Sequence, residues 1–238
     1  MGSNSFRRIV ASFENGRYAQ HRIETRTLGV GDDVARNGRI SDAKLDEIRG
    51  TLAAFRSACD SEGAAPVTAV GTAAFRDAPN GTRAVAIAAQ LGIAMEIATE
   101  QRESALAYLA GSLGREGYAV IDNGSRSIEL VSRPGGVLQY QVFNLGYRVA
   151  YETFFAKATR AAEAAMAFRG QLLQHSSGAA FMKGMKFREL KTRKDIDRAL
   201  PRLIAAATLT EAFGYSEILL TERELGAGLI IEAGISPR

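Results

Sequence analysis

One order of elements occurs twice along the chain, and it limits the possible folds more than any other feature of the sequence. Each half begins with short apolar or β-branched runs joined by a tight turn and continues with helical patterns. The turn in the first half is Asn15-Gly16, a strong hairpin signal, and the second half uses Pro134-Gly135-Gly136. This order predicts an α/β protein of two lobes, which we expect over residues 1–114 and 115–238.

Local patterns predict the elements of each lobe. Apolar runs predict strands over residues 9–13, 18–25, 67–70, 93–98, 118–121, 128–131, 137–143 and 218–220. Helical spacing predicts helices over residues 42–62, 82–91, 101–113, 151–173, 195–213 and 222–231, the first of them capped by Ser41. Gly29, Gly31 and Gly38 indicate connections between elements.

Composition excludes several classes of protein. The chain has 238 residues, of which 46% are hydrophobic and 24% charged, as in a soluble globular protein. Its apolar runs are too short to span a membrane, and its start lacks the pattern of a signal peptide, so we expect a cytoplasmic protein. The single cysteine, Cys59, excludes a disulfide framework, and two histidines, His21 and His175, give poor support to a zinc enzyme or a His-dependent triad.

Positive charge is concentrated in one stretch of the sequence. The net charge is +4, and the segment from Lys183 to Arg202 holds eight basic and three acidic residues. This basic stretch 183–202 is either the solvated start of a helix or a surface that attracts a polyanion. Nucleic acid is the weaker option for a partner, because lone aromatic residues near the stretch make no stacking platform.

Three polar segments adjoin predicted strands, where α/β proteins place their ligands. Gly2, Ser3, Asn4 and Ser5 precede the first strand, and small residues with donor groups suit an oxyanion, although such a start is also typical of a frayed terminus. Arg76 follows a buried strand, where a guanidinium can clamp phosphate.

The third polar segment joins two strands and runs from Asp122 to Glu129. Its backbone, at Gly124 and Ser127 for example, can hold phosphate oxygens, while the two carboxylates suit a hard cation. The alternative is an ordinary hairpin in which Asp122 forms an Asx-turn.

Together these segments resemble the ordered motifs of the exopolyphosphatase and guanosine pentaphosphate phosphatase family (Ppx/GppA). Gly2-Ser3-Asn4-Ser5-Phe6 is similar to the first phosphate loop of the family, and Gly71 to Asn80 is similar to its arginine-containing signature. Asp122 to Glu129 is similar to the second loop, and Thr221 to Leu229 to the closing strand–helix segment. The resemblance extends over nearly the whole chain.

The resemblance implies two ribonuclease-H-like lobes of the sugar-kinase, actin and heat-shock-chaperone superfamily, with a cleft between them. It also implies release of terminal phosphate from polyphosphate or guanosine pentaphosphate, with Mg²⁺ and a water activated by a glutamate. The phosphate ligands carried over are Gly2, Ser3, Asn4, Ser5, Arg76, Gly124 and Ser127, and the metal ligands are Asp122 and Glu129. Guanosine tetraphosphate is a further expected ligand, and pairing into a homodimer is a further expectation.

The chain departs from the family pattern at four places. In an ungapped alignment Arg102 occupies the position of the catalytic glutamate, and arginine cannot accept a proton, which leaves Glu103 as the candidate base. Ser125 and Arg126 replace glycines of the second loop. Met1 stands where the first strand of the family should end, so a truncated first strand is expected, and the second lobe is short.

Three functions therefore remain open from the sequence. The chain is a working phosphoanhydride phosphatase, a member that binds polyphosphate or an alarmone without efficient turnover, or a structural or partner-binding protein. If either of the first two functions is right, we expect Asn4, Arg76 and Ser127 to face one another across the cleft.

Overall fold

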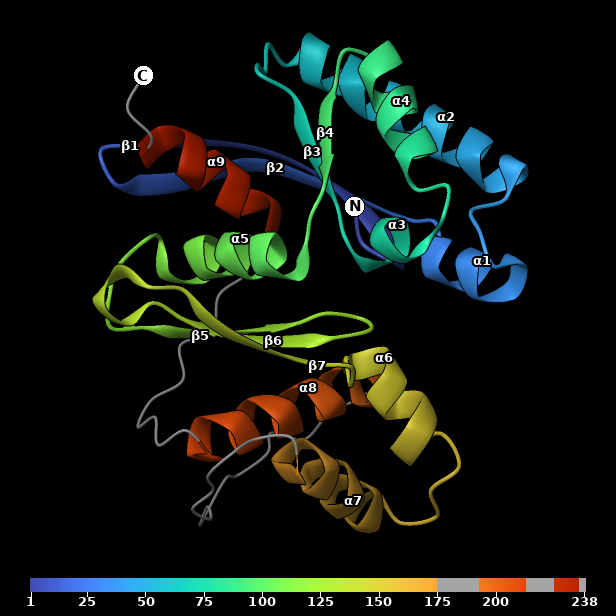
Figure 1. Ribbon diagram of the computed structural model, residues 1–238, viewed down its shortest axis with the longest axis vertical. Coiled ribbons are helices and arrows are strands. Elements are labelled where there is room, and N and C mark those ends of the chain that lie inside the picture. Colours follow the sequence, from blue (N-terminus) through green and yellow to red (C-terminus); the bar gives the residue numbers. More distant parts are fainter. Residues whose placement is uncertain (175–192, 213–224, 236–238) are drawn as a thin grey trace. The chain divides into compact units, whose positions relative to one another are not determined.

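The computed structural model describes residues 1–174, 193–212 and 225–235 (Figure 1). The chain divides into two compact units, the first formed by Met1–Tyr118 with Arg223–Arg238 and the second by Ala119–Glu222. The expected lobes met at residues 114 and 115, close to this division. They differ at the C-terminus, because helix α9 (Leu225–Ile235) packs in unit 1 rather than with the second lobe.

Unit 1 contains two separate pairs of strands. Strands β1 (Ser5–Glu14) and β2 (Arg17–Thr27) form an antiparallel hairpin, and β3 (Thr68–Gly71) pairs in parallel with β4 (Ala94–Ile97). The predicted hairpin turn at Asn15-Gly16 is confirmed, and both residues are left-handed, with φ angles of 51° and 72°.

The helices of unit 1 follow the predicted order with two additions. They are α1 (Val30–Asn37), α2 (Asp42–Ser61), α3 (Ala73–Asp77), α4 (Thr82–Gln90), α5 (Glu100–Ser112) and α9. Ser41 caps α2 as expected, since its hydroxyl accepts from the Lys44 amide. Helix α1 was missed, because Gly29 and Gly38, both left-handed, stand at its two ends and are also typical of loops.

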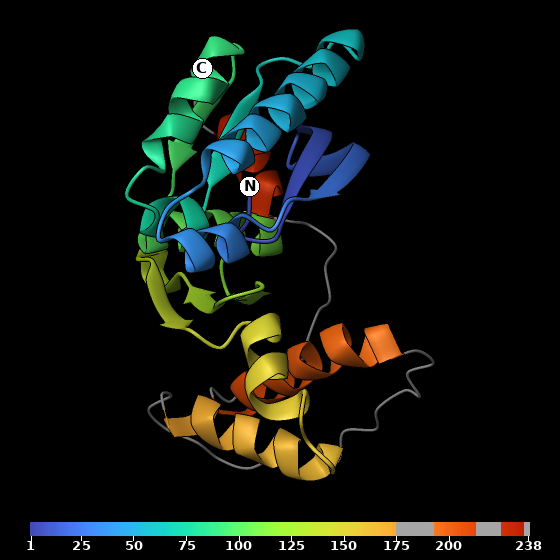
Figure 2. The same cartoon turned by 90° about the vertical axis from the view of Figure 1, so that its right-hand side faces the viewer.

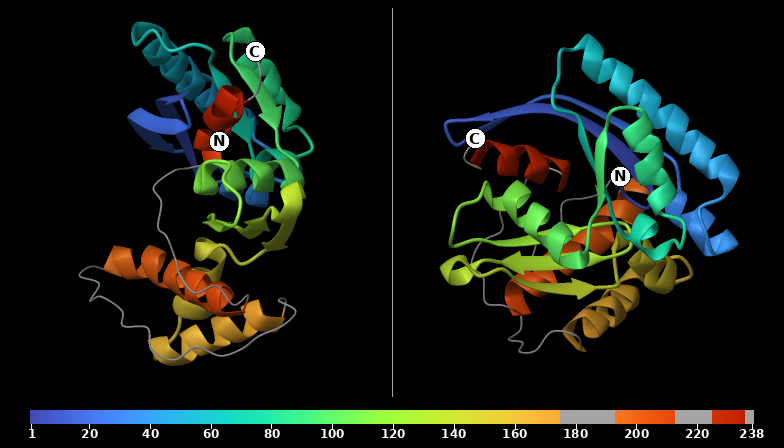
Figure 3. Two further views of the ribbon diagram at one scale, coloured as in Figure 1. Left: turned by 90° about the vertical axis from the view of Figure 1, so that its left-hand side faces the viewer. Right: turned by 45° about the horizontal axis from the view of Figure 1, so that its top comes forward.

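Helices cover both faces of the strands of unit 1 (Figures 1 and 3), and core residues lie beneath them on each face. On one side, residues of α2 and α4 such as Ile48 and Ile87 pack with Phe6 of β1. On the other side, Leu106 of α5 packs with Val70 of β3, and α9 completes this layer beside α5. The strands are therefore covered by two layers of helices, the arrangement typical of α/β folds.

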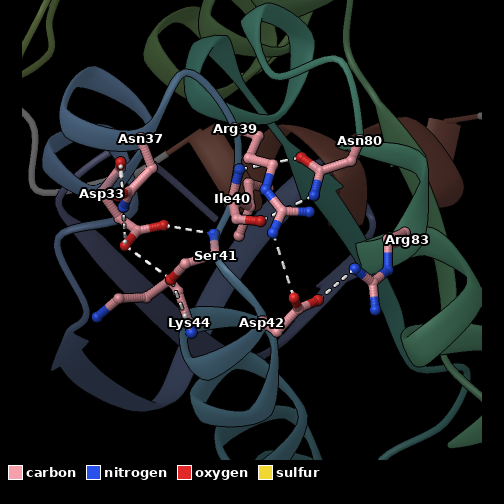
Figure 4. A network of polar contacts seen from close by, with 9 residues as sticks. All are labelled: Asp33, Asn37, Arg39, Ile40, Ser41, Asp42, Lys44, Asn80 and Arg83. Atoms are coloured by element: carbon pink, nitrogen blue, oxygen red, sulfur yellow. Dashed lines mark hydrogen bonds and ion pairs between the residues drawn. The ribbon is translucent and has the colours of Figure 1, made fainter.

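A polar network fixes the connection between α1 and α2 (Figure 4). The buried Asp33 carboxylate accepts hydrogen bonds from the amide and hydroxyl of Ser41 and from the Asn37 side chain, at 2.7 to 3.0 Å. The Asn80 side chain donates to the Ile40 carbonyl oxygen at 2.8 Å and accepts from the Ile40 amide at 3.0 Å. Asn80, part of the arginine-containing signature, thus has a structural task 40 residues away in the chain.

Unit 2 combines a three-stranded antiparallel sheet with a group of helices (Figures 1 and 2). The strands are β5 (Ala119–Asn123), β6 (Ile128–Ser132) and β7 (Gln139–Phe143), and the 3₁₀ turn η1 (Pro134–Gly136) joins the last two. The helices are α6 (Tyr147–Ala150), the π-turn η2 (Tyr151–Phe155), α7 (Ala161–Gln174) and α8 (Arg193–Ala212). Phe168, Leu172 and Leu209 pack against one face of the sheet.

One long helix was predicted over residues 151–173, and this prediction is wrong. The helix is interrupted between η2 and α7. Phe154 and Phe155 both contact the ring of Phe168, with centroid distances of 5.5 and 6.2 Å, and the chain must turn back to bring them there. Aromatic packing therefore prevails over the helical preference of the alanine-rich sequence.

Some predicted features lie outside the described residues, namely the strand at 218–220 and residues 183–192 of the basic stretch. Residues 193–202 of that stretch belong to α8. Among the residues that the structure describes, none of the helices combines the length and the apolar character that a membrane crossing needs.

The Asn80 contacts lead to a stability prediction. Replacing Asn80→Ala removes both hydrogen bonds to the Ile40 backbone and should lower the free energy of unfolding by about 2 kcal/mol. Urea denaturation measures the difference, with the exposed Asn144→Ala as the control. Equal stability of the two variants would contradict a bracing role for Asn80.

Candidate functional site

The first polar turn, Gly2–Ser5, is held by the segment that begins α1. The Asn4 carbonyl oxygen accepts from the amides of Leu28 and Gly29, each at 3.0 Å, and the Ser3 carbonyl accepts from Gly31 at 2.7 Å. A side chain at Gly31 would press on Ser3, so this approach requires glycine. The turn is an ordered part of unit 1, and its carbonyl oxygens are engaged with the backbone of residues 28–31.

Arg76 and Glu103 form the most chemically distinctive pair in unit 1. Arg76 lies on α3 and Glu103 in the first turn of α5, and Nη1 of Arg76 donates to Oε2 of Glu103 at 3.1 Å. The same nitrogen donates to the Ala98 carbonyl oxygen at 2.8 Å. Nε and Nη2 of Arg76 make no hydrogen bond within the described residues, so these donors remain for an anion.

The environment of Glu103 makes its carboxyl a weaker acid than usual. Its side chain is only 13% exposed. Burial raises the pKa of Glu103 above its ordinary value, and this effect outweighs the opposing influence of Arg76. Positive charge at Met1 also acts on the carboxylate, which links the Glu103 environment to the start of the first turn.

Met1 lies beside β3 at the same end of unit 1. Its ammonium group donates to the Val70 carbonyl oxygen at 2.7 Å, and its own carbonyl oxygen accepts from the Thr72 amide at 3.2 Å. Thr72 in turn begins α3, the helix of Arg76. That the first strand of the family pattern is truncated stays a prediction.

Arg102, the residue at the expected catalytic position, has a different partner. Its two Nη atoms donate to the two carboxylate oxygens of Glu232 on α9 at 2.6 and 2.7 Å, and its Nε donates to Glu96 at 3.0 Å. Neighbouring residues on a helix point about 100° apart, so Arg102 and Glu103 serve different sides of α5. The guanidinium of Arg102 is committed to the packing of α9.

The third polar segment, Asp122 to Glu129, includes the turn of the β5–β6 hairpin in unit 2. The carbonyl oxygens of Gly124, Ser125 and Arg126 accept from the amides of Tyr147, Arg148 and Gly146 at 2.9 to 3.1 Å. A side chain at Gly146 would overlap the backbone of Arg126 and Ser127, so only glycine permits this approach. These three carbonyl groups of the turn therefore already accept hydrogen bonds from the backbone of residues 146–148.

Asp122 and Glu129 face each other across the two strands of this hairpin. They are direct partners in the antiparallel register, so their side chains share one face, and Glu129 is buried. Two carboxylates opposite each other repel unless a cation or donors lie near, and oxygen ligands are what Mg²⁺ prefers. The residues therefore fit the expected metal, which commonly uses one or two carboxylates with water and phosphate oxygens. Within the described residues no group of three or more acidic, histidine or cysteine side chains forms a complete metal cage.

In unit 1 the structure brings Arg76 into contact with Glu103, and it joins Met1, just before the Gly2–Ser5 turn, to Thr72 at the start of α3. In unit 2 it places the predicted residues on one hairpin. That Asn4 and Arg76 face Ser127 stays a prediction. The residues that sequence reasoning missed are those that support the turns, Gly31 and Gly146 above all. Their only local signal was glycine, which is shared with ordinary loops.

Comparison with known proteins defines first the fold and then the family. The structure of a Ppx/GppA family member from Aquifex aeolicus is similar over 98% of this chain and 95% of that chain, with a TM-score of 0.78 and 19% identity. A second Aquifex aeolicus structure, the type II variant of the Ppx/GppA phosphatase, has a TM-score of 0.77 at 18% identity and covers 99% and 97% of the two chains. An exopolyphosphatase from Cytophaga hutchinsonii has a TM-score of 0.58 at 22% identity and covers 74% of this chain and 58% of that one.

These similarities confirm the expected fold, because the mixed α/β structure of this chain matches those of Ppx/GppA proteins. A comparison with curated proteins finds no match. The model of the Ppx/GppA phosphatase family matches residues 9–194, which is most of the chain. The chain belongs to the Ppx/GppA phosphatase family.

The Arg102–Glu232 contact predicts a pH-dependent contribution to stability. Arg102 lowers the pKa of Glu232, so the contribution is present above pH 4.5 and is lost as the pH falls through the lowered pKa. Glu232→Gln should therefore destabilise the protein at pH 7, and the difference from wild type should shrink in acid below pH 4.5. Urea denaturation across this range measures it, with the exposed Glu163→Gln as the control. A difference that stays constant with pH would contradict the ion pair.

Proposed function

We propose that this chain releases the terminal phosphate of a condensed phosphate, polyphosphate or guanosine pentaphosphate, with Glu103 as the general base. The observation that carries the proposal is the Arg76–Glu103 pair. In this pair a buried carboxylate with a raised pKa lies beside a guanidinium whose Nε and Nη2 make no hydrogen bond within the described residues. A carboxylate whose pKa is raised toward the working pH is a better base for an attacking water.

The residues of the neighbourhood have complementary tasks in this proposal. Arg76 neutralises charge on the phosphate through Nε or Nη2 while Nη1 orients Glu103. The Gly2–Ser5 turn supplies donors from small residues that permit close approach. Phosphoryl transfer requires mainly this positioning and charge neutralisation, with one group to take the proton of water.

Asp122 and Glu129 are proposed to hold Mg²⁺ in unit 2. When bound, the ion supplies charge neutralisation to the phosphate oxygens. The turn between the two residues, with Gly124 and Ser127, is proposed as the second phosphate loop. We propose a cytoplasmic location and a homodimer on the family resemblance alone.

The departures of the sequence from the family pattern favour a second function, binding of a polyanion without efficient turnover. Ser125 and Arg126 occupy positions of the turn where the resemblance expects glycine, which favours binding of a polyanion with slow turnover. An assay of phosphate release separates the phosphatase from the binding protein, because a binding protein retains the ligand but releases little phosphate. Absence of binding to either ligand would favour a structural or partner-binding role.

Replacement of the proposed base gives the sharpest test of catalysis. Glu103→Gln should lower kcat/KM for phosphate release by about 10²- to 10⁴-fold, because an amide cannot accept the proton of water. Glu100→Gln, an exposed neighbour in the same turn of α5, is the matched control and should retain activity. Equal activity of Glu103→Gln and Glu100→Gln would exclude Glu103 as the base.

The same assay carries a pH prediction. Because the ionised carboxylate is the active form, kcat/KM should rise with pH through the raised pKa of Glu103. The midpoint of this acidic limb should lie above 4.5, the ordinary glutamate value, and the limb should be absent from the residual activity of Glu103→Gln. A limb that persists in the variant assigns the titration to another group.

The carboxylate pair predicts the metal dependence. Asp122→Asn removes one charge from the proposed ligand pair and should raise the Mg²⁺ concentration for half-maximal activity by about ten-fold or more. Asp77→Asn, an exposed acid in unit 1, is the control. An unchanged Mg²⁺ requirement would show that the ion is not held by Asp122.

A further inference from the structure

We propose that Glu232 of α9 is a positioning residue for Glu103, which it serves by holding Arg102 in the first turn of α5. The inference rests on the proposed function, because it concerns the base of that reaction. It adds a residue that no motif of the sequence indicates, since the segment that resembles the closing motif of the family ends at Leu229. Glu232 lies 130 positions from Arg102 in the chain, so only folding brings the two together.

The first turn of α5 has few hydrogen bonds of its own. In the first turn of any helix the amides lack partners within the helix. Here the Thr99 side chain caps α5 by accepting from the Arg102 amide at 3.1 Å, and the Thr99 carbonyl oxygen accepts from the Glu103 amide at 2.9 Å. Contacts with other elements therefore decide how firmly the turn, and with it the Glu103 side chain, is held.

Arg102 binds this turn to two other elements of unit 1. Its two Nη atoms donate to the two carboxylate oxygens of Glu232 at 2.6 and 2.7 Å, and its Nε donates to Glu96 of β4 at 3.0 Å. A planar guanidinium that makes paired hydrogen bonds to a carboxylate is fixed in direction as well as in distance. The contact with Glu232 therefore resists both rotation and sliding of the first turn of α5 relative to α9.

Helix α9 offers a firm support for this contact. Figure 1 shows α9 beside α5, and both belong to unit 1. A side chain at Gly228 would overlap the backbone of Leu106, so the two helices lie in close contact. Ile231, the neighbour of Glu232, is fully buried and packs with Leu109 of α5. The Glu232 carboxylate is thus carried by a part of α9 whose place is set by core packing.

Arg76 holds the same turn from the side of α3. Its Nη1 donates to the Ala98 carbonyl oxygen at 2.8 Å, directly before the cap of α5, and to Oε2 of Glu103 at 3.1 Å. A hydrogen bond of this length is near the long end of the usual range, so a shift of the turn by about 1 Å would break it. Loss of the contact with Glu232 would permit such a shift, and a base displaced by about 1 Å can lose about 10²-fold in rate.

The measurable sign of such a shift is the acidity of Glu103. Burial is the largest influence on its pKa, and the charged groups that act on it are Arg76, the positive charge at Met1 and Glu100 of its own helix. Burial raises the pKa and outweighs the opposing influence of Arg76. A Glu103 side chain released toward solvent should therefore return toward the ordinary pKa of 4.5.

The first measurement is an NMR titration of the Glu103 carboxyl carbon in the full chain. In Glu232→Gln the pKa of Glu103 should be lower than in the wild type, because an amide cannot accept both hydrogen bonds of Arg102 and the turn is released. Glu163→Gln is the matched control, because Glu163 is an exposed helical glutamate that also pairs with an arginine. It should leave the pKa of Glu103 unchanged.

The second measurement is phosphate release at a temperature at which thermal melting shows all variants to be folded. Glu232→Gln should lower kcat by about ten-fold with KM unchanged, because a displaced base slows the reaction and leaves binding intact. Glu232→Asp should recover part of the loss, since its carboxylate can still pair with Arg102. Arg102→Gln combined with Glu232→Gln should be no slower than Arg102→Gln alone, because both changes remove one contact.

The outcomes separate the positioning role from the proposed function. A pKa of Glu103 in Glu232→Gln that equals the wild-type value would overturn the positioning role, and so would a kcat equal to that of Glu163→Gln. Losses that add in the double variant would show that Glu232 acts apart from Arg102, which also contradicts the role. If the wild type releases no phosphate but the pKa of Glu103 still falls in Glu232→Gln, the proposed function fails and the positioning contact stands.

Discussion

Close contact between α5 and α9 is the constraint on which the site-bearing part of unit 1 depends. Gly228 of α9 lies so near Leu106 of α5 that a side chain would overlap the Leu106 carbonyl group. Ile231 packs with Leu109 farther along the two helices, and the Arg102–Glu232 pair closes the contact at the first turn of α5. Because that turn also carries Glu103, the C-terminal helix helps to fix the carboxylate that we propose as the base.

Two consecutive residues of α5 divide the structural and chemical tasks between them. Arg102 points to α9, whereas Glu103 contacts Arg76 from α3. Position in an alignment cannot separate such neighbours, since a shift by one residue turns a side chain by about 100° around the helix. The contacts separate them, because only Glu103 combines burial with a cationic partner that keeps donors for an anion.

The hairpin of unit 2 illustrates a different principle, in which the backbone rather than a side chain prepares a site. Residues 146–148 engage three carbonyl groups of the turn, and Gly146 makes the approach possible. What remains at the turn is hydroxyl and guanidinium groups, which are donors to an anion. On the strands behind it, Asp122 and Glu129 are direct partners in the antiparallel register of the hairpin.

The sequence by itself determined the elements whose signals are local. Asn15-Gly16 predicted the hairpin, Ser41 the start of α2, and the glycine-rich motifs the family, because turn and cap preferences act over a few residues. Only the tertiary structure decided the break before α7, the place of α9 in unit 1 and the partner of Arg102. These depend on contacts between residues far apart in the chain, up to 130 positions for Arg102 and Glu232. A local sequence pattern cannot predict them, because the free energy of such a contact depends on a partner outside the pattern.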